Sequence, residues 1–142
     1  ALEKARALAL DRGVQVHWVC SDWQHFDWQP EAWDNVVAIF IQFADPAERE
    51  QLFARMHESL KPGGTLVVVD HSAVAGSGTR DADTLHRIDK AAVIDALTAA
   101  GFKLEAESAL YARPDDPRSA NVFDPAIRGK TDQFALRFRK PG

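Results

Sequence analysis

The sequence predicts an α/β fold in which strands alternate with helices. Two short apolar runs, residues 35–41 and 65–69, are typical of strands buried on both faces of a parallel sheet. Residues 46–60 between them have the composition of a helix, with an apolar stripe at helical spacing. Because strands joined through helices form parallel sheets, we expect an open α/β sheet with helices packed on both faces.

The N-terminal part predicts a helix, a strand and a loop in that order. Residues 1–12 are rich in Ala and Leu, which favour a helix, and Gly13 is a typical residue at a helix end. Residues 14–20 alternate in polarity and include β-branched and aromatic residues, as strands do. Residues 21–31 are polar and aromatic, contain Pro30 and are expected to form a loop.

Capping residues mark the two helices of the middle region. Asp45 followed by Pro46 is a typical start for a helix that runs to about residue 60. Asp89 is placed to cap a further helix that runs to about residue 100. We expect residues 70–84 to form a loop between the second buried strand and this later helix.

The C-terminal region predicts two strands that flank a long irregular segment. Residues 102–110 and 134–138 have strand patterns, and residues 111–131 contain three prolines. Irregular segments of this length in compact domains are usually functional or cover a site. Since no helix separates the two strands, we expect an antiparallel pair with the C-terminal strand at the edge of the sheet, where its basic residues protect it from aggregation.

Composition narrows the class of protein. The 142 residues suit one domain, and a hydrophobic content of 46% is enough for a real core. A net charge of −4 argues against binding of nucleic acid or of an anionic membrane. The single cysteine, Cys20, excludes an intramolecular disulfide and a zinc site built on several thiolates. No stretch resembles a membrane span or a secretion signal, so we expect a soluble cytoplasmic protein.

Candidate site residues follow the buried strands, where ligands of open α/β sheets bind. Asp70 and His71 come directly after the second strand. His71 and His86 are candidate proton acceptors, or else hydrogen-bonded loop histidines. Arg87 either pairs with a carboxylate or phosphate of a substrate or holds its loop together. The spacing of Asp70, His71, His86 and Asp89 matches no standard set of metal ligands, so we expect no metal site.

A second group of candidates lies earlier in the chain. Phe40 and Gln42 follow the first buried strand, and Gln42 carries an amide suited to orienting a ligand through hydrogen bonds. Asp22 and Trp23 lie in the loop at residues 21–31, close to three further tryptophans. Clustered aromatic residues line some ligand pockets, although they more often anchor loops or fill the core.

Several of these segments resemble the class I S-adenosylmethionine-dependent methyltransferase domain. The matching residues are Asp34-Asn35-Val36-Val37-Ala38-Ile39-Phe40, a helix, and then Leu60-Lys61-Pro62-Gly63-Gly64-Thr65-Leu66-Val67. Residues 69–73, 76–78, 83–89 and 121–134 resemble a group of bacterial predicted methyltransferases. The resemblance implies a single partial methyltransferase domain over residues 1–142 with a Rossmann-like sheet.

The resemblance also implies a cofactor, a substrate class and residue roles. The cofactor is S-adenosyl-L-methionine and the partner is a small-molecule acceptor. Asp22 is similar to the acidic residue that accepts the adenine amino group, and Trp23 is placed to stack on the purine. Phe40 and Gln42 correspond to positions that face the transferred methyl group. In this interpretation His71 and His86 are catalytic, and Asp70 and Arg87 bind the acceptor.

The sequence departs from that family at its N-terminal end. Such methyltransferases begin with a strand, a glycine-rich turn and a second strand that ends in an acidic residue, and none of these features occurs before residue 14. The sequence therefore predicts a sheet that lacks the first two strands. Two alternatives stay open, namely an active methyltransferase and an inactive remnant or interaction module that forms a homodimer through the incomplete sheet edge.

Overall fold

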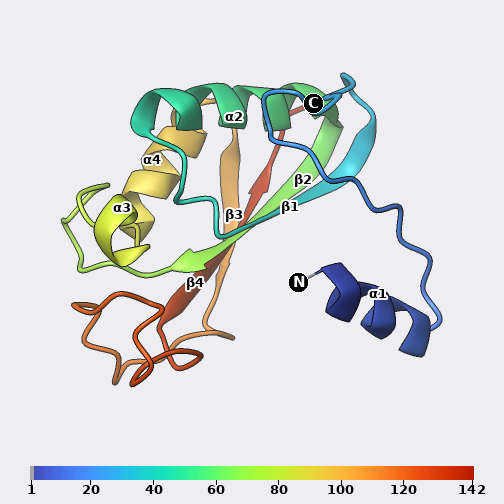
Figure 1. Ribbon diagram of the computed structural model, residues 1–142. Helices are drawn as coiled ribbons and strands as arrows, with labels where there is room; N and C mark the ends of the chain where they lie inside the picture. Colours follow the sequence, from blue (N-terminus) through green and yellow to red (C-terminus); the bar gives the residue numbers. More distant parts are fainter. Residues whose placement is uncertain (1) are drawn as a thin grey trace.

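The fold is a four-stranded open sheet with helices along one side (Figure 1). The structure is a computed structural model and describes residues 2–142. Its elements in chain order are α1 (Leu2–Asp11), β1 (Trp33–Ile39), α2 (Pro46–Ser59), β2 (Leu60–His71), α3 (Ala82–Leu85), α4 (Lys90–Ala99), β3 (Lys103–Ser108) and β4 (Gln133–Arg139). The expected α/β class is confirmed, and β2 is longer at both ends than the run that predicted it.

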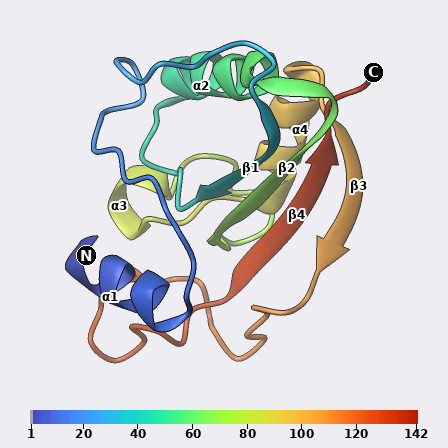
Figure 2. The ribbon, with the colours of Figure 1, turned by 90° about the vertical axis from the view of Figure 1, so that its right-hand side faces the viewer.

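The strands lie in the order β1-β2-β4-β3 (Figure 2). β1 and β2 run parallel, and both β2–β4 and β3–β4 are antiparallel. The antiparallel C-terminal pair is confirmed, but the expected edge position of the last strand is wrong, because β4 lies inside the sheet and β3 forms the edge. The basic side chains Arg137 and Arg139 of β4 pair with Glu105 of β3, so they link two strands rather than protect an edge.

One face of the sheet carries the hydrophobic core. Alternate residues of β2 and β4 point to this face, where α2 and α4 pack on them. The fully buried members include Phe53, Leu66, Leu97, Leu136 and Phe138. The expected helical cover of both faces is not found within residues 2–142, since Val37 and Ile39 on the other face of β1 are 60% and 55% exposed. β1 also forms an open edge of the sheet.

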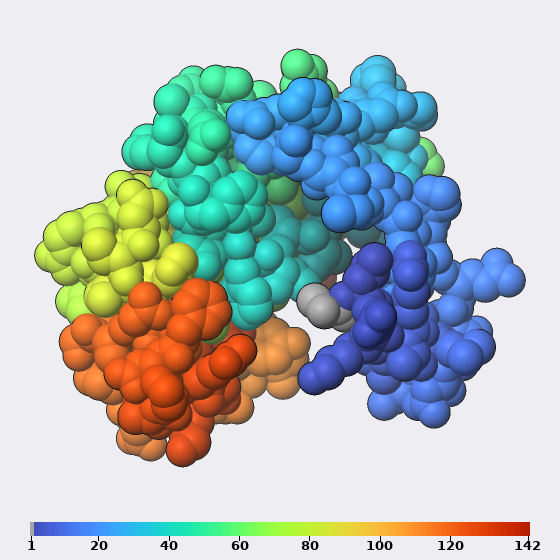
Figure 3. All heavy atoms as spheres, in the orientation of Figure 1, coloured from blue at the N-terminus to red at the C-terminus, as the bar shows by residue number. Residues whose placement is uncertain are grey.

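Residues 14–20 do not form the predicted strand. The chain here is extended, but it has no assigned strand pairing, and Val14, Val16 and Val19 are exposed. A strand needs a neighbour for its backbone hydrogen bonds, and no strand of the described sheet pairs with this segment. The expected N-terminal helix is confirmed as α1, which buries none of its residues and stands apart from the sheet in Figure 3.

Local capping explains why the two long helices start where they do. Asp45 accepts a hydrogen bond from the Glu48 backbone amide at 2.8 Å, and the Glu48 carboxylate accepts one from the Asp45 amide at 3.2 Å. This reciprocal pair is a capping box, and it satisfies two amides at the start of α2. Asp89 caps α4 by accepting from the Ala91 amide at 3.0 Å. No helix in the described part of the chain has the length and apolar character that crossing a bilayer requires.

A buried ion pair ties the long irregular segment, residues 109–132, to the rest of the fold. Arg87 binds both carboxylate oxygens of Asp116, at 2.8 and 3.1 Å, and both side chains are almost fully buried. Arg87 also donates to the backbone carbonyls of Ser72 and Ala120. Burial by itself raises the pKa of Asp116, but the hydrogen bonds from Arg87 and from nearby backbone amides keep that pKa below its usual value.

We expect Arg87→Met to destabilise the protein by about 3–5 kcal/mol, because it leaves the Asp116 carboxylate buried without its cation. Urea denaturation followed by circular dichroism measures the effect. Arg55 forms an exposed pair with Glu58, so Arg55→Met is the matched control and is expected to cost no more than about 1 kcal/mol. Equal losses in the two variants would contradict the role given to Arg87.

Candidate functional site

The carboxyl ends of β1 and β2 meet at one edge of the sheet. Ile39 pairs in register with Val69, so the residues that follow each strand are neighbours. The Phe40 backbone amide donates to the Val69 carbonyl at 2.9 Å, which continues the ladder by one residue. Phe40 has a φ of 57°, a left-handed conformation that is uncommon for a residue with a side chain. Such conformations persist where the surrounding structure holds them, and they cluster at functional sites.

Phe40 stacks on His71 at this edge. Their ring centroids are 4.5 Å apart and the ring planes differ by 1°. The His71 Nδ1 atom lies 3.0 Å from the Thr131 hydroxyl, so the imidazole is held on one side by an aromatic ring and on another by a hydrogen bond. Burial, and then the positive charge of Arg87, lower the pKa of His71 to about 4. The imidazole is therefore neutral at pH 7.

Asp70 is buried directly behind this edge. One carboxylate oxygen accepts from the His71 backbone amide at 2.7 Å, and the other has no partner among the described residues. Burial raises the pKa of Asp70 to about 7, against the opposing effects of the His71, Ile41 and Gln42 amides and of the Arg49 charge. Asp70 is thus positioned to shape the turn after β1, and it is not exposed to a substrate.

Gln42 and Arg49 are buried beside Asp70. Arg49 donates to the Ala44 carbonyl at 2.5 Å, and burial lowers the pKa of its guanidinium. The Gln42 side-chain oxygen and the Arg49 Nε atom lack partners among the residues described. Because Gln42 is only 7% exposed, it is placed to organise the turn rather than to contact a ligand directly.

His86 and Arg87 follow the short helix α3 and have different surroundings. His86 takes the left-handed conformation that ends α3, and its ring meets Phe123 edge to face at 5.0 Å. Arg87 uses its guanidinium on Asp116 and on two backbone carbonyls. The structure therefore supports the second of the two roles expected for Arg87, holding the loop together, and provides no access for a substrate anion.

Asp22 and Trp23 line an open cleft of about 400 Å³. Its other walls include Phe26, Trp28 and Phe43, and Phe43 comes from the turn after β1. The Trp28 indole N–H donates to the Trp23 carbonyl at 2.7 Å, which fixes the loop. Phe43, which lines this cleft, lies only three positions after Phe40 in the chain, so the cleft is close in sequence to the Phe40–His71 edge.

The Asp22 carboxylate is ionised and partly available in this cleft. One of its oxygens binds both the His25 backbone amide, at 2.8 Å, and the His25 ring, at 2.6 Å. The backbone hydrogen bond from His25 is the main reason that the pKa of Asp22 lies below its usual value. The Asp22 side chain is 56% exposed, so the carboxylate can accept a hydrogen bond from a ligand.

Sequence reasoning missed two residues of the site. Thr131 holds His71, and Arg49 lies behind Asp70. Thr131 falls in a segment that resembled bacterial methyltransferases, which was the available signal. Arg49 is placed on a helix with charged neighbours, and nothing in its sequence context distinguishes it from a surface residue. Within residues 2–142 no group of three or more His, Cys, Asp or Glu side chains is arranged to hold a metal ion.

Comparison with known proteins supports the predicted resemblance. A methyltransferase domain family matches residues 1–64, which is less than half of the chain. A search of curated protein sequences found no match. The fold is similar to that of many solved methyltransferase structures, so the predicted resemblance is confirmed at the level of the fold.

Three of these structures illustrate the likeness. The [4+2]-cyclase SpnF has a TM-score of 0.66 and 20% identity over 96% of this chain and 61% of its own. N-methyltransferase NodS from Bradyrhizobium japonicum, solved with S-adenosyl-L-homocysteine, has a TM-score of 0.65 and 20% identity over 96% of this chain and 60% of its own. A SAM-dependent methyltransferase from Methanosarcina mazei has a TM-score of 0.64 and 15% identity over 90% and 68%.

The similarity to these structures concerns the fold of the chain and not the reaction. The chain spans about three fifths of the length of SpnF and NodS. One of the similar structures is described as a cyclase and another as an N-methyltransferase, so the shared fold does not determine the reaction. Any activity therefore depends on the residues at the carboxyl edge of the sheet.

We expect Asp70→Asn to change how stability depends on pH. With a folded pKa of about 7 and an unfolded value near 3.8, Asp70 is protonated in the folded state and ionised in the unfolded state between these limits. The unfolded state loses the Asp70 proton at a lower pH than the folded state does. The free energy of unfolding of the wild type, relative to that of Asp70→Asn, therefore falls as the pH rises, by up to about 1.4 kcal/mol per pH unit. The difference levels off above pH 7.

Urea denaturation of both proteins at several pH values from 4 to 8.5 measures this difference. Taking the difference removes the contribution of His71, whose lowered pKa acts in the opposite direction at acidic pH. A wild-type minus variant difference that does not vary with pH would show that Asp70 is ionised in the folded protein.

Proposed function

We propose that this chain forms the acceptor side and the adenine cleft of an S-adenosyl-L-methionine-dependent methyltransferase that acts on a small molecule. The observation that carries the proposal is the Phe40–His71 stack at the joined carboxyl ends of β1 and β2, three residues from the cleft that holds Asp22. Ligands of open α/β sheets bind at this end of the strands. The matching methyltransferase domain family supports the same assignment.

The cleft around Asp22 fits the adenine part of the cofactor. An adenine ring needs flat apolar surfaces and a hydrogen-bond acceptor for its exocyclic amino group. Trp23, Phe26 and Phe43 supply the surfaces, and the exposed carboxylate of Asp22 supplies the acceptor. The cofactor brings the reactive methyl group on a positively charged sulfur, and the chain's own residues have to align an acceptor with it.

His71 is suited to aligning an acceptor. If its Nδ1–H donates to the Thr131 hydroxyl, the Nε2 lone pair is left to accept a hydrogen bond from an acceptor N–H or O–H. Since its pKa is near 4, the imidazole is neutral and ready to accept, but it is a weak base. Its main contribution is therefore orientation, which in-line methyl transfer requires more than proton removal. Phe40 covers one face of the ring and limits access of water.

The open edge of β1 supports a second candidate, an interaction module that pairs with another copy. Its exposed apolar residues Val37 and Ile39 and its unpaired backbone groups invite association. Analytical ultracentrifugation distinguishes the two states. A concentration-dependent dimer that a Val37→Lys substitution dissociates supports pairing at β1, and a monomer over the whole concentration range contradicts it.

Binding of S-adenosyl-L-homocysteine tests the methyltransferase proposal. We expect saturable binding in isothermal titration calorimetry, weakened about tenfold or more by Asp22→Ala through loss of the hydrogen bond to adenine. Asp27 lies in the same loop but does not line the cleft, so Asp27→Ala is the matched control and should bind as the wild type does.

Two results would contradict the proposal. Unchanged affinity in Asp22→Ala would remove this residue from the cofactor site. Absence of binding by the folded chain would remove the cofactor itself.

A further inference from the structure

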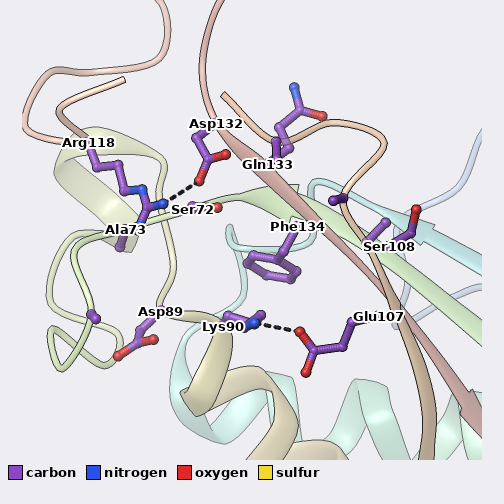
Figure 4. Close-up of a pocket in the computed structure, with 14 residues that line it drawn as sticks. Ser72, Ala73, Asp89, Lys90, Glu107, Ser108, Arg118, Asp132, Gln133 and Phe134 are labelled. Carbon is purple, nitrogen blue, oxygen red and sulfur yellow. Dashed lines mark hydrogen bonds and ion pairs between the residues drawn. The ribbon is translucent and has the colours of Figure 1, made fainter. Parts of the chain in front are cut away.

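A cavity of about 410 Å³ lies beyond the carboxyl end of β2, between α4 and the segment that follows β3 (Figure 4). Small residues make this space, namely Ala73, Ala75, Ala109, Ala112 and Ala135. Ser72 also lines it and directly follows His71. Neither Phe40 nor His71 is among the residues that line this cavity, so it is distinct from the Phe40–His71 edge.

The cavity has an aromatic wall between two ion pairs. The Phe134 ring points into the space and is otherwise buried (Figure 4). On one side of it Lys90 pairs with Glu107 at 2.5 Å, and on the other Arg118 pairs with Asp132 at 2.8 Å. A ligand in this space therefore meets an apolar surface with both signs of charge at each end.

Not all of these charges are available to a ligand. The Asp89 carboxylate, which also lines the cavity, binds the backbone amides of Ala91 and Gly76. Asp132 binds the Arg113 amide in addition to Arg118. In contrast, Glu107 is about half exposed with one oxygen unpaired among the described residues, and Arg118 uses one terminal nitrogen on Asp132. The remaining guanidinium N–H groups of Arg118 can bind a carboxylate.

Arg118 is held in place before any ligand arrives. Its φ is 59°, and its backbone amide donates to Asp116 at 3.1 Å. Asp116 is itself fixed by the buried Arg87. A cation anchored in this way loses little freedom on binding, which favours recognition of a small ligand.

We propose that this cavity binds a small linear zwitterion with a carboxylate at one end and a primary ammonium group at the other, the chemistry of an ω-amino acid. Its carboxylate binds Arg118, its ammonium binds Glu107, and its carbon skeleton lies against Phe134. The volume lies within the usual range for small-molecule pockets. The site is independent of the methyl-transfer edge and does not rest on the proposed function.

Titration with 5-aminopentanoate, followed by ¹H–¹⁵N chemical shifts, tests the proposal. Butylamine and pentanoate are 5-aminopentanoate without the carboxylate and without the ammonium, and each is expected to bind at least about tenfold more weakly than 5-aminopentanoate. Saturable shifts are expected at the amides of Ser72, Ala73, Ser108 and Ala112, which line the cavity.

Variants separate this site from adventitious binding. Arg118→Gln and Glu107→Gln should each weaken the binding of 5-aminopentanoate about tenfold or more. Arg128→Gln and Glu58→Gln remove the same charges elsewhere and should bind as the wild type does, and thermal unfolding checks that all four variants are folded. No saturable shift, equal binding of butylamine, or unchanged affinity in Arg118→Gln or Glu107→Gln would each overturn the proposal.

Discussion

The buried ion pair between Arg87 and Asp116 is the interaction on which both candidate sites depend. It joins the turn after α3 to a segment of more than twenty residues that contains no helix or strand. Asp116 in turn accepts hydrogen bonds from the backbone amides of Arg118 and Asp132. A buried charge is energetically costly unless it is paired, so pairing of Asp116 with Arg87 fixes the position of the irregular segment. Thr131 then reaches His71, and Arg118 faces the cavity at Phe134.

A second constraint comes from the parallel pairing of β1 and β2. Parallel strands end at the same edge of a sheet, so Phe40 and His71 meet although they are far apart in sequence. Behind them the Asp70 carboxylate is buried against the turn after β1, at the cost of a pKa raised to about 7. The left-handed Phe40 and the unpaired polar atoms of Gln42 and Asp70 are departures from ideal structure in this small region. Departures of this kind are expected where a protein binds or reacts.

Much of the fold could be predicted from the sequence, because the signals were local. Asp45 and Asp89 cap helices where their positions implied, and residues 35–39 of the run at 35–41 lie in the parallel strand β1. The strand expected at residues 14–20 is absent because a strand depends on a neighbour that the local pattern does not reveal. The interior position of β4 and the pairing of Arg87 with Asp116 depend on long-range contacts. The spacing of residues in the sequence does not reveal such contacts. The same limit applies to Thr131, which lies 60 positions from His71.

Native-state hydrogen exchange tests most directly whether the ion pair holds the irregular segment in place. The backbone amides of Arg118 and Asp132 lie outside any strand or helix, yet both donate to Asp116. If Arg87 and Asp116 fix the segment, these two amides exchange as slowly as those of β2 and β4, since they open only when the core does. Rapid exchange of Arg118 and Asp132, at the rate of an exposed loop while the strands stay protected, would contradict the central role of the pair.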